Sequence, residues 1–258
     1  MEKRRFFSIV TVVKNDLKGL GETLGSLKVQ SCKDFEWIVV DGGSTDGSVE
    51  LLKNEASIDP IWRSEDDNGI YDAMNKGVRM SGGKYIVFMN AGDLFADDDT
   101  LSDVREAIEC SGAKEPVLFG GAVLEFPNGR RWYRRPRDAT EYIWHGLPAN
   151  HQATYYPAGW LRDNPYSDEY AYCGDYYVAA RAVEAEIPFV YLAKAVARFR
   201  VGDKSYSHPV RLIVEAYRVQ RNVVGVSLAR RIISLLRRVI AIAGTTGIFR
   251  LPGRFKVQ

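Results

Sequence analysis

The chain is poor in cysteine and histidine. Its 258 residues contain three of each, and the cysteines, Cys32, Cys110 and Cys173, are scattered without a C-x-x-C pair. Structural zinc sites and disulfide frameworks need such residues in closely spaced pairs, so neither is expected to hold this fold together. Scattered, unpaired cysteines are typical of a reducing compartment, which predicts a cytoplasmic protein.

Long apolar runs are absent as well. No stretch of about 18 uncharged apolar residues occurs, so no simple membrane-spanning helix is expected. The start, MEKRRFFSIVTVVKND, looks like a signal peptide, but its apolar run, 6–13, is short, rich in β-formers and without a small-residue cleavage site. We therefore interpret this run as a first β-strand.

Acidic residues are missing from the end of the chain. Residues 227–258 contain six arginines, one lysine and no Asp or Glu, whereas the rest has 28 basic and 33 acidic residues. Two arginine pairs seven residues apart, at 230–231 and 237–238, fall on one face of a helix, with apolar residues largely on other faces. Such a basic amphipathic helix is typical of binding to a membrane surface. Packing on the body or a homodimer seam are the alternatives, and nucleic acid is not expected because no recognition motif accompanies the charge.

Strand and helix patterns alternate along the first half. Strand-like segments occur at 6–13, 35–41, 58–66 and 84–93, with helical segments at 16–31, 42–56 and 68–83 between them. Near-continuous apolar strands separated by helices predict an α/β fold with a parallel sheet covered on both faces. In the less regular second half we expect a helix at 98–111, two antiparallel strands around 127–129, a loop-rich stretch at 138–160, a helix from Gly174, a strand at 189–202 and helices from Pro209.

Polar residues follow these strands at the carboxyl ends, where ligands bind in such sheets. They are Asn15 after the first strand, Asp41 after the second, 65–67 after the third and Asp93 after the fourth. Asp41 is expected to accept hydrogen bonds from a nucleobase, such as the N3–H of uracil or the N1–H and amino group of guanine. Asp93, on the turn 90–92, is either a turn-capping carboxylate or a ligand to a metal ion or phosphate-bound cation.

The turn DGGSTDGS at 41–48 is not a dinucleotide-binding fingerprint. It lacks G-x-G-x-x-G, and Asp46 near the helix start would repel a pyrophosphate there. A nicotinamide-dependent dehydrogenase is therefore disfavoured, and Asp46 is interpreted as a turn and cap residue.

Four segments, in this order and spacing, resemble glycosyltransferase family 2: SIVTVVKN, FEWIVVDGGSTDGS, SEDDNGIYDAMNKG and YIVFMNAGD. The resemblance covers about residues 6–205 and implies the GT-A fold, a Rossmann-like α/β fold whose mixed, mainly parallel sheet is flanked by helices and binds a nucleotide sugar. It implies a glycosyltransferase domain at 1–208, with a nucleotide-sugar-binding half at 1–97 and an acceptor-binding half at 98–208, followed by a basic amphipathic helical tail at 209–258.

The resemblance further implies an inverting sugar transfer, in which a divalent cation or basic side chains stabilise the departing diphosphate. Asp93 matches the family's metal-ligating carboxylate, for Mn²⁺ or Mg²⁺, and Asn90 stands where the family often has Asp. Met74 stands where the family often has Arg, and Lys76 either compensates for it or is a solvated helix residue. The positions matched to nucleotide-sugar binding are Thr11, Asn15, Asp41, Asp67, Asn75, Asn90, Ala91, Gly92 and Asp93, with Asp66 and Glu65 as alternatives to Asp67.

The acceptor hydroxyl must lose its proton during transfer. The resemblance assigns that base to Asp175, in YCGDYYVAAR, and places His151 and Gln152 near the donor sugar and the acceptor. The simpler interpretations are a helix N-terminal Asp, which contributes about 1 kcal/mol to the helix, and a structural loop histidine.

A narrower resemblance involves three stretches of the second half. YIWHGLPANHQATYYP, DYYVAAR and the turn 202–205 are similar to the colanic-acid-type fucosyltransferases of bacterial exopolysaccharide pathways. This implies GDP-fucose as the donor in preference to a UDP-sugar. The wider family resemblance implies a polyprenyl-linked oligosaccharide as the acceptor and peripheral association with the inner face of the plasma membrane.

Two other interpretations stay open. A sugar nucleotidyltransferase is also an α/β nucleotide-binding enzyme, but it usually has a Gly-rich loop with Arg and Lys after its first strand, and TVVKNDLKGLGETL lacks that pattern. A degenerate, non-enzymatic carbohydrate-binding protein is favoured only if Asn90 and Met74 mark lost chemistry, and donor hydrolysis or transfer would exclude it.

Overall fold

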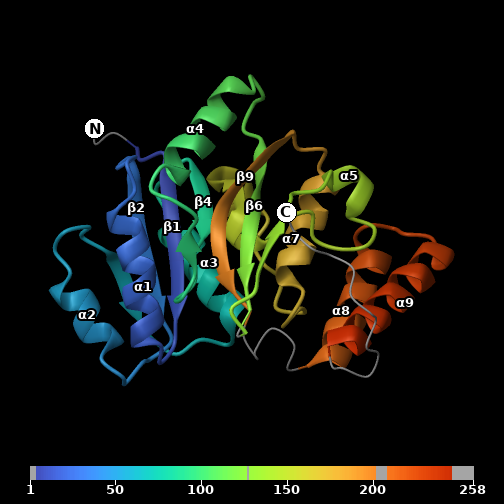
Figure 1. Cartoon of the computed structure of the whole chain (residues 1–258), viewed down its shortest axis with the longest axis horizontal. Helices are drawn as coiled ribbons and strands as arrows, with labels where there is room; N and C mark the ends of the chain where they lie inside the picture. The colour runs from blue at the N-terminus through green and yellow to red at the C-terminus, as the bar shows by residue number, and fades with distance from the viewer. Residues whose placement is uncertain (1–3, 127, 202–207, 246–258) are drawn as a thin grey trace.

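The structure, a computed structural model, describes residues 4–126, 128–201 and 208–245 (Figure 1). The turn at 202–205 and the tail residues 246–258 lie outside the described residues. Figure 1 shows a central sheet with helices on both faces and the two C-terminal helices together at one end.

In the first half, strands and helices alternate as predicted. The elements are β1 (Phe7–Val13), α1 (Leu17–Lys28), β2 (Phe35–Asp41), α2 (Ser48–Asn54), β3 (Ile61–Ser64), α3 (Ile70–Met80) and β4 (Tyr85–Phe88). Asp46 accepts from the N–H and hydroxyl of Ser48 at the start of α2 and from the N–H of Leu17 at the start of α1. Asp46 is therefore the turn residue that the sequence predicted, whereas the N-cap positions of α1 and α2 are Asp16 and Gly47.

The second half contains more strand than the sequence predicted. Its elements are β5 (Leu94–Phe95), α4 (Thr100–Cys110), β6 (Val117–Glu125), β7 (Arg131–Arg134), α5 (Ala139–Tyr142), the 3₁₀ helix η1 (His151–Ala153), β8 (Thr154–Pro157), α6 (Ala158–Asp163), α7 (Gly174–Glu184), β9 (Phe189–Arg200), α8 (Pro209–Asn222) and α9 (Leu228–Thr245). The expected loop at 138–160 is partly wrong, because it contains β8 and the start of α6. A four-residue strand that ends in proline carries too short a pattern to be recognised from sequence.

The described strands form one mixed sheet in the order β3-β2-β1-β4-β8-β6-β9-β5, with β7 paired to β6. β3, β2, β1 and β4 run parallel, and β6 runs parallel to β9. β8 is antiparallel to both β4 and β6, so it joins the two halves of the sheet. The longest pairings are parallel, which confirms the predicted mixed, mainly parallel sheet.

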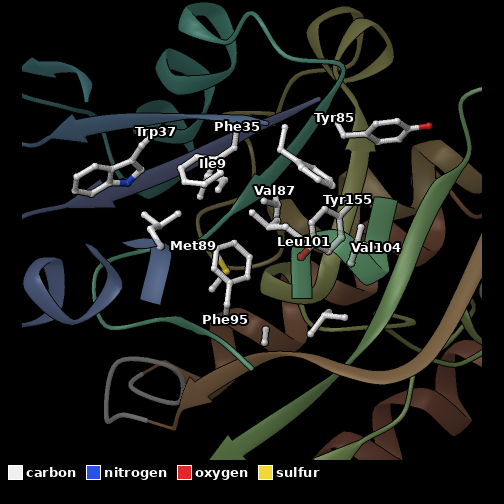
Figure 2. Packing of buried hydrophobic residues seen from close by; sticks show 14 of the residues in the cluster. Ile9, Phe35, Trp37, Tyr85, Val87, Met89, Phe95, Leu101, Val104 and Tyr155 are labelled. Atoms are coloured by element: carbon white, nitrogen blue, oxygen red, sulfur yellow. The ribbon is translucent and has the colours of Figure 1, made fainter. Parts of the chain in front are cut away.

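Each strand of the parallel half sends alternate side chains to opposite faces of the sheet. Ile9, Trp37 and Val87 pack with residues of α1 and α4 on one face (Figure 2). Val10 and Ile38 pack with residues of α3, α6 and α7 on the other face. Burial on both faces explains why these strands are apolar throughout, and it fixes their register, because a slip of one residue would move every side chain to the opposite face.

The pairing register brings the polar strand ends to one edge of the sheet. Val13 of β1 pairs with Asp41 of β2, and Asp41 pairs with Ser64 of β3. The turn after β4 lies beside the end of β1, because the N–H of Ala91 donates to the carbonyl of Val12 at 3.2 Å. This edge is where a parallel sheet binds its ligands.

The two C-terminal helices dock on the body. α8 packs against α7 through Ala216 and Val219. α9 turns its polar side inward, and Ser234 is fully buried there. Its hydroxyl accepts from the amide of Gln220 at 2.7 Å and lies 2.9 Å from Nδ1 of His145.

The arginine pairs divide between two sides of α9. Arg231 donates to the hydroxyl of Tyr217 at 3.0 Å, and Arg238 donates to the carbonyl of His145. The other arginine of each pair is exposed. Arg231 and Arg238 are therefore held by a hydroxyl of α8 and a carbonyl of the body, so for these two residues the structure shows packing rather than an exposed basic face.

Apolar side chains of α9 face outward instead. We call these residues the outer face of α9: Leu228, Ile232, Ile233, Leu235, Leu236, Val239 and Ile240, each at least 36% exposed. Across the parts of the chain that the structure describes, no helix has both the length and the apolar character to cross a membrane.

Two helical glycines give a matched test of the packing of α3 on the sheet. A Cβ at Gly77 of α3 would clash with the side chain of Val10, whereas nothing lies within 4 Å of a Cβ at Gly25 of α1. We predict that Gly77→Ala lowers the free energy of unfolding by about 1–2 kcal/mol, because overpacking exceeds the gain in helix propensity. Gly25→Ala should raise it by about 0.5–1 kcal/mol. Urea unfolding measures both, and a stabilised Gly77→Ala protein would contradict the tight contact of α3 with β1.

Candidate active site

The turn that follows β4 is held by a hydroxyl from α1. Oγ1 of Thr23 accepts from the N–H of Gly92 at 3.0 Å and lies within 3.1 Å of the carbonyl oxygens of Asn90 and Asp93. Gly92 has a φ of +90°, a conformation that favours glycine. These contacts fix the turn, and with it the direction of the Asp93 side chain.

Asp93 is a buried carboxylate, with 6% of its surface exposed. Its Oδ2 accepts from the backbone N–H of Asn90 and from the side-chain amide of Gln152, each at 3.1 Å. Burial raises the pKa of Asp93 to about 6, although His151, Gln152 and the Asn90 N–H each lower it. The charged form is thus destabilised in the ligand-free protein, which suits a carboxylate that meets a cation.

His151 lies between two carboxylates. Its Nε2 is 3.3 Å from Nδ2 of Asn90, and its Nδ1 is 3.8 Å from Oδ2 of Asp175. With the Asn90 amide donating to Nε2, the proton of a neutral imidazole sits on Nδ1 and faces Asp175. Burial alone would lower the pKa of His151, but the hydrogen bond and charge of Asp175, together with the charge of Asp93, raise it. A connected chain of polar groups therefore runs from the end of β4 to the start of α7.

Asp175 lies in the first turn of α7. Its Oδ1 accepts from the backbone N–H of Tyr176 at 2.8 Å, and the hydroxyl of Tyr71 donates to the same oxygen at 3.4 Å. The segment just before the helix is held by Glu215 of α8, whose carboxylate accepts from the N–H groups of 171–173. These contacts orient the Asp175 carboxylate and leave Oδ2 toward His151.

A second group of polar residues surrounds the turn after β2. Asp41 is fully buried. Its Oδ2 accepts from the N–H groups of Gly43 at 3.1 Å and Ser44 at 2.9 Å, and from the Ser64 hydroxyl at 2.6 Å. Its Oδ1 is buried without a hydrogen-bond partner. An unpaired buried acceptor is costly, so this oxygen is a candidate to receive an N–H from a ligand.

Asn15 and Asp67 both contact this turn. Asn15, at a φ of +50°, accepts from the N–H of Thr45 at 2.9 Å. A Cβ at Gly42 would lie 2.5 Å from Oδ2 of Asp67, so the Asp67 carboxylate packs directly on the turn. Asp41, Asn15 and Asp67, which the sequence marked separately, therefore lie together.

The other acidic residues after β3 are placed differently. Glu65 pairs with Arg63 at 3.3 Å and with Lys76 at 3.2 Å. Lys76 also lies 3.3 Å from Asp72 and donates to the carbonyl of Asp66 at 2.8 Å. Lys76 is thus held in ion pairs that brace the acidic loop.

Two residues matched to nucleotide binding, Thr11 and Asn75, use their side chains for hydrogen bonds within the fold, and Met74 is buried. Thr11 is fully buried, and its hydroxyl forms two hydrogen bonds within the sheet. Asn75 exchanges two hydrogen bonds with the backbone of Tyr166. Met74, where an arginine was expected to meet a diphosphate, is in the core. The side-chain groups of Thr11 and Asn75 are paired within the fold, and their predicted contact with a nucleotide stays a prediction.

Buried oxygens without partners mark where a cation fits. Oδ1 of Asn90 and Oε1 of Gln152 lack hydrogen-bond partners, and both residues contact the Asp93 carboxylate. Mn²⁺ and Mg²⁺ take oxygen ligands, several of which a diphosphate can supply. Within the described residues, no cluster of three or more His, Cys, Asp or Glu side chains could hold a metal alone. The residues present therefore fit a cation shared with phosphates, with Asp93 as its charged protein ligand.

Sequence reasoning missed two contributors to the site. Thr23 holds the Asp93 turn, and Tyr71 contacts Asp175. Both lie on helices, where a single polar or aromatic residue carries no distinctive pattern. The one available signal was the position of Tyr71 inside NGIYDAMNKG.

The chain belongs to glycosyltransferase family 2, because residues 8–164, more than half of its length, match the model described as glycosyl transferase family 2. A PGL/p-HBAD biosynthesis glycosyltransferase of Mycobacterium bovis is 35% identical over 129 residues, which are 48% of this chain and 49% of that protein. An uncharacterized glycosyltransferase of Mycobacterium tuberculosis is 38% identical over 111 residues, 43% of this chain and 41% of that protein. The matches thus span less than half the length of these curated relatives.

Solved structures resemble most of the chain at low identity. Residues 1–349 of Staphylococcus aureus TarS, in complex with UDP-GlcNAc, give a TM-score of 0.71 at 20% identity, over 94% of this chain and 75% of that one. The mannosyltransferase PcManGT of Pyrobaculum calidifontis, in complex with GDP-Man and Mn²⁺, gives 0.67 at 14% identity, over 97% and 78%. These likenesses show the fold, which is the GT-A fold that the sequence resemblance implied.

We predict that Asp93→Asn stabilises the ligand-free protein at pH 7. The folded-state pKa of Asp93, about 6, exceeds the value of about 4 in an unfolded chain. The wild-type protein therefore loses stability as the pH rises from about 4 to about 6. The Asp93→Asn protein does not, because its amide side chain stays neutral. Urea unfolding with a chelator present should show a gain of about 1–3 kcal/mol at pH 7 and almost none at pH 4. An equal gain at both pH values would contradict the assignment.

Proposed function

We propose that the chain is an inverting glycosyltransferase that moves a sugar from a nucleotide-diphosphate sugar to an acceptor hydroxyl. The observation that carries this proposal is the polar chain at the carboxyl edge of the sheet. It links Asp93 through Asn90 and His151 to Asp175. Two carboxylates with separate environments and one histidine between them provide a site for the leaving group and a base for the attacking group.

On the donor side, the unpaired Oδ1 of Asp41 accepts a hydrogen bond from an N–H of the nucleobase. Asp67 and Asn15 shape the turn beside it. A divalent cation, when bound at Asp93, supplies positive charge that stabilises the departing diphosphate. The partnerless oxygens of Asn90 and Gln152 support this position for the cation.

On the acceptor side, Asp175 takes the proton of the attacking hydroxyl. Tyr71 and the Tyr176 N–H hold one carboxylate oxygen, and His151 faces the other. Asp175 and Asp93 come from different elements and are linked through Asn90 and His151. A sugar bound between them would have its leaving group on one side and the base on the other, as inversion requires.

The donor is proposed from the narrower resemblance, and the acceptor from the resemblance to the family. The narrower resemblance favours GDP-fucose, and a UDP-sugar is the alternative, since similar folds are known with UDP-GlcNAc in TarS and with GDP-Man and Mn²⁺ in PcManGT. The proposed acceptor is a polyprenyl-linked oligosaccharide used in bacterial exopolysaccharide or surface polysaccharide synthesis. The domain division at 208, a homodimer and a location at the inner face of the plasma membrane stay predictions.

We further propose that α8 and α9 bind an anionic membrane surface through the outer face of α9. Glu215 is the only acidic residue in 208–245, and it is buried. The exposed charges of the two helices are therefore all positive, and they border a broad apolar surface. This combination suits insertion of the apolar side chains between lipid headgroups.

Asp175→Asn should lower the turnover rate about 10²- to 10⁴-fold, because the amide cannot accept a proton. The dissociation constant for the donor nucleotide should stay unchanged. Release of nucleoside diphosphate from GDP-fucose and from UDP-GlcNAc, with extracted bacterial lipid-linked saccharides as acceptor, measures turnover. Glu184→Gln is the matched control, since it makes the same chemical change at an exposed position of the same helix. Wild-type turnover by Asp175→Asn would exclude Asp175 as the base.

The double variant Leu236→Glu/Ile240→Glu should weaken binding to vesicles that contain phosphatidylglycerol by about tenfold or more, because it places negative charge on the outer face of α9. Co-sedimentation of the full chain measures the change. Ile61→Glu, at an exposed apolar position of β3 on the far edge of the sheet, is the control. Equal binding by the double variant and the control would rule out this face as the lipid contact.

A further inference from the structure

A cavity of about 540 Å³ lies between the start of α3 and the segment 166–171. Its volume falls within the range of about 300–1,000 Å³ that small-molecule sites occupy. Neither Asp41 nor Asp93 lines it. The cavity is therefore separate from the groups assigned above to the nucleotide and its cation.

Tyrosine rings form much of the cavity wall. The rings of Tyr71 and Tyr166 stack with centroids 5.1 Å apart and planes 11° apart, and Tyr170 also lines the cavity. The side-chain amide of Asn75 holds the backbone of Tyr166 through two hydrogen bonds, of 2.8 and 2.9 Å. The wall is thus preformed, and tyrosine side chains of this kind present both apolar ring surface and a polar hydroxyl end.

The polar groups of the cavity select against anions. Asp72 and Asp168 line it, together with amide and hydroxyl side chains, and among the residues that the structure describes no lysine or arginine does. Lys76 pairs with Asp72 but is not part of the lining. Carboxylates accept hydrogen bonds from sugar hydroxyls and repel phosphates, so the lining suits a neutral, polyhydroxylated ligand.

The cavity wall also touches the proposed base. Tyr71 lines the cavity, and its hydroxyl donates to Oδ1 of Asp175. A Cβ at Gly174, the residue before Asp175, would lie 2.8 Å from the Tyr71 ring, so the two elements are in close contact. A saccharide seated against Tyr71 would therefore be connected to Asp175 through the Tyr71 hydroxyl.

We propose that this cavity binds an uncharged sugar residue of the acceptor and so selects acceptors whose terminal saccharide carries no acidic group. The inference rests on the proposed function, since it takes Asp175 as the base. It adds to that function the location and the chemical class of the acceptor saccharide.

Saturation-transfer NMR tests the proposal without turnover. The probes are the methyl glycosides of glucose, galactose, mannose and N-acetylglucosamine, with methyl glucuronide as the acidic comparison. The variants are Ile70→Trp, which adds bulk at a lining residue that is 45% exposed, and Asp168→Ala, which removes a hydrogen-bond acceptor. Glu169→Ala is the control, because Glu169 is exposed beside Asp168 and does not line the cavity. GDP and UDP binding is measured on every variant as a check on folding and on the donor site.

We expect saturation transfer to at least one neutral glycoside and none to the glucuronide. Saturation transfer to the glycoside should vanish in Ile70→Trp. It should fall about fivefold in Asp168→Ala, which is the loss of affinity expected for one hydrogen bond. Glu169→Ala and nucleotide binding should be unaffected. Three results would each overturn the assignment. They are saccharide binding that survives Ile70→Trp, nucleotide binding that fails only in the two cavity variants, and preference for the glucuronide. Failure of the proposed function would look different, because no protein, wild type included, would then bind GDP or UDP.

Discussion

The hydrogen bond from Gln152 to the Asp93 carboxylate is the contact on which the site depends. Gln152 lies in η1, directly before β8, and β8 is the strand that joins the parallel half of the sheet to the second half. Ile86 of β4 pairs with Tyr156 of β8, and this register brings Gln152 to the end of β4. The same placement puts His151 beside Asn90, and so within reach of the helix that carries Asp175.

Function at this edge is associated with local destabilisation. Asp93 is buried with a raised pKa, and one oxygen each of Asp41, Asn90 and Gln152 is buried without a partner. Each unsatisfied buried acceptor costs about 1–3 kcal/mol. The apolar cores on both faces of the sheet offset this cost. Proteins commonly place destabilising polar groups at a functional site and compensate for them with stable packing elsewhere. A donor nucleotide and its cation would satisfy these groups together.

The sequence predicted the first half of the fold well, because its strands are buried on both faces and therefore read as apolar runs between helical patterns. It also placed Asp41, Asp93 and Asp175 at the ends of elements, where the structure has them. It could not predict β8, which is too short, or the hydrogen bonds of Thr11 and Asn75, which depend on packing across the sheet and against the 166–171 segment. The sequence could not predict the orientation of α9 for a similar reason. Helical spacing shows which residues share a face, but the partners of Arg231 and Arg238 lie far away in sequence or on the preceding helix.

Calorimetric titration of GDP and of UDP into the purified protein, with Mn²⁺ and with a chelator, tests the central claim most directly. One of the two nucleotides should bind, and its affinity should fall about tenfold or more when Mn²⁺ is removed or Asp93 is replaced by alanine. Binding of neither nucleotide in the presence of Mn²⁺ would contradict a donor site at this edge of the sheet.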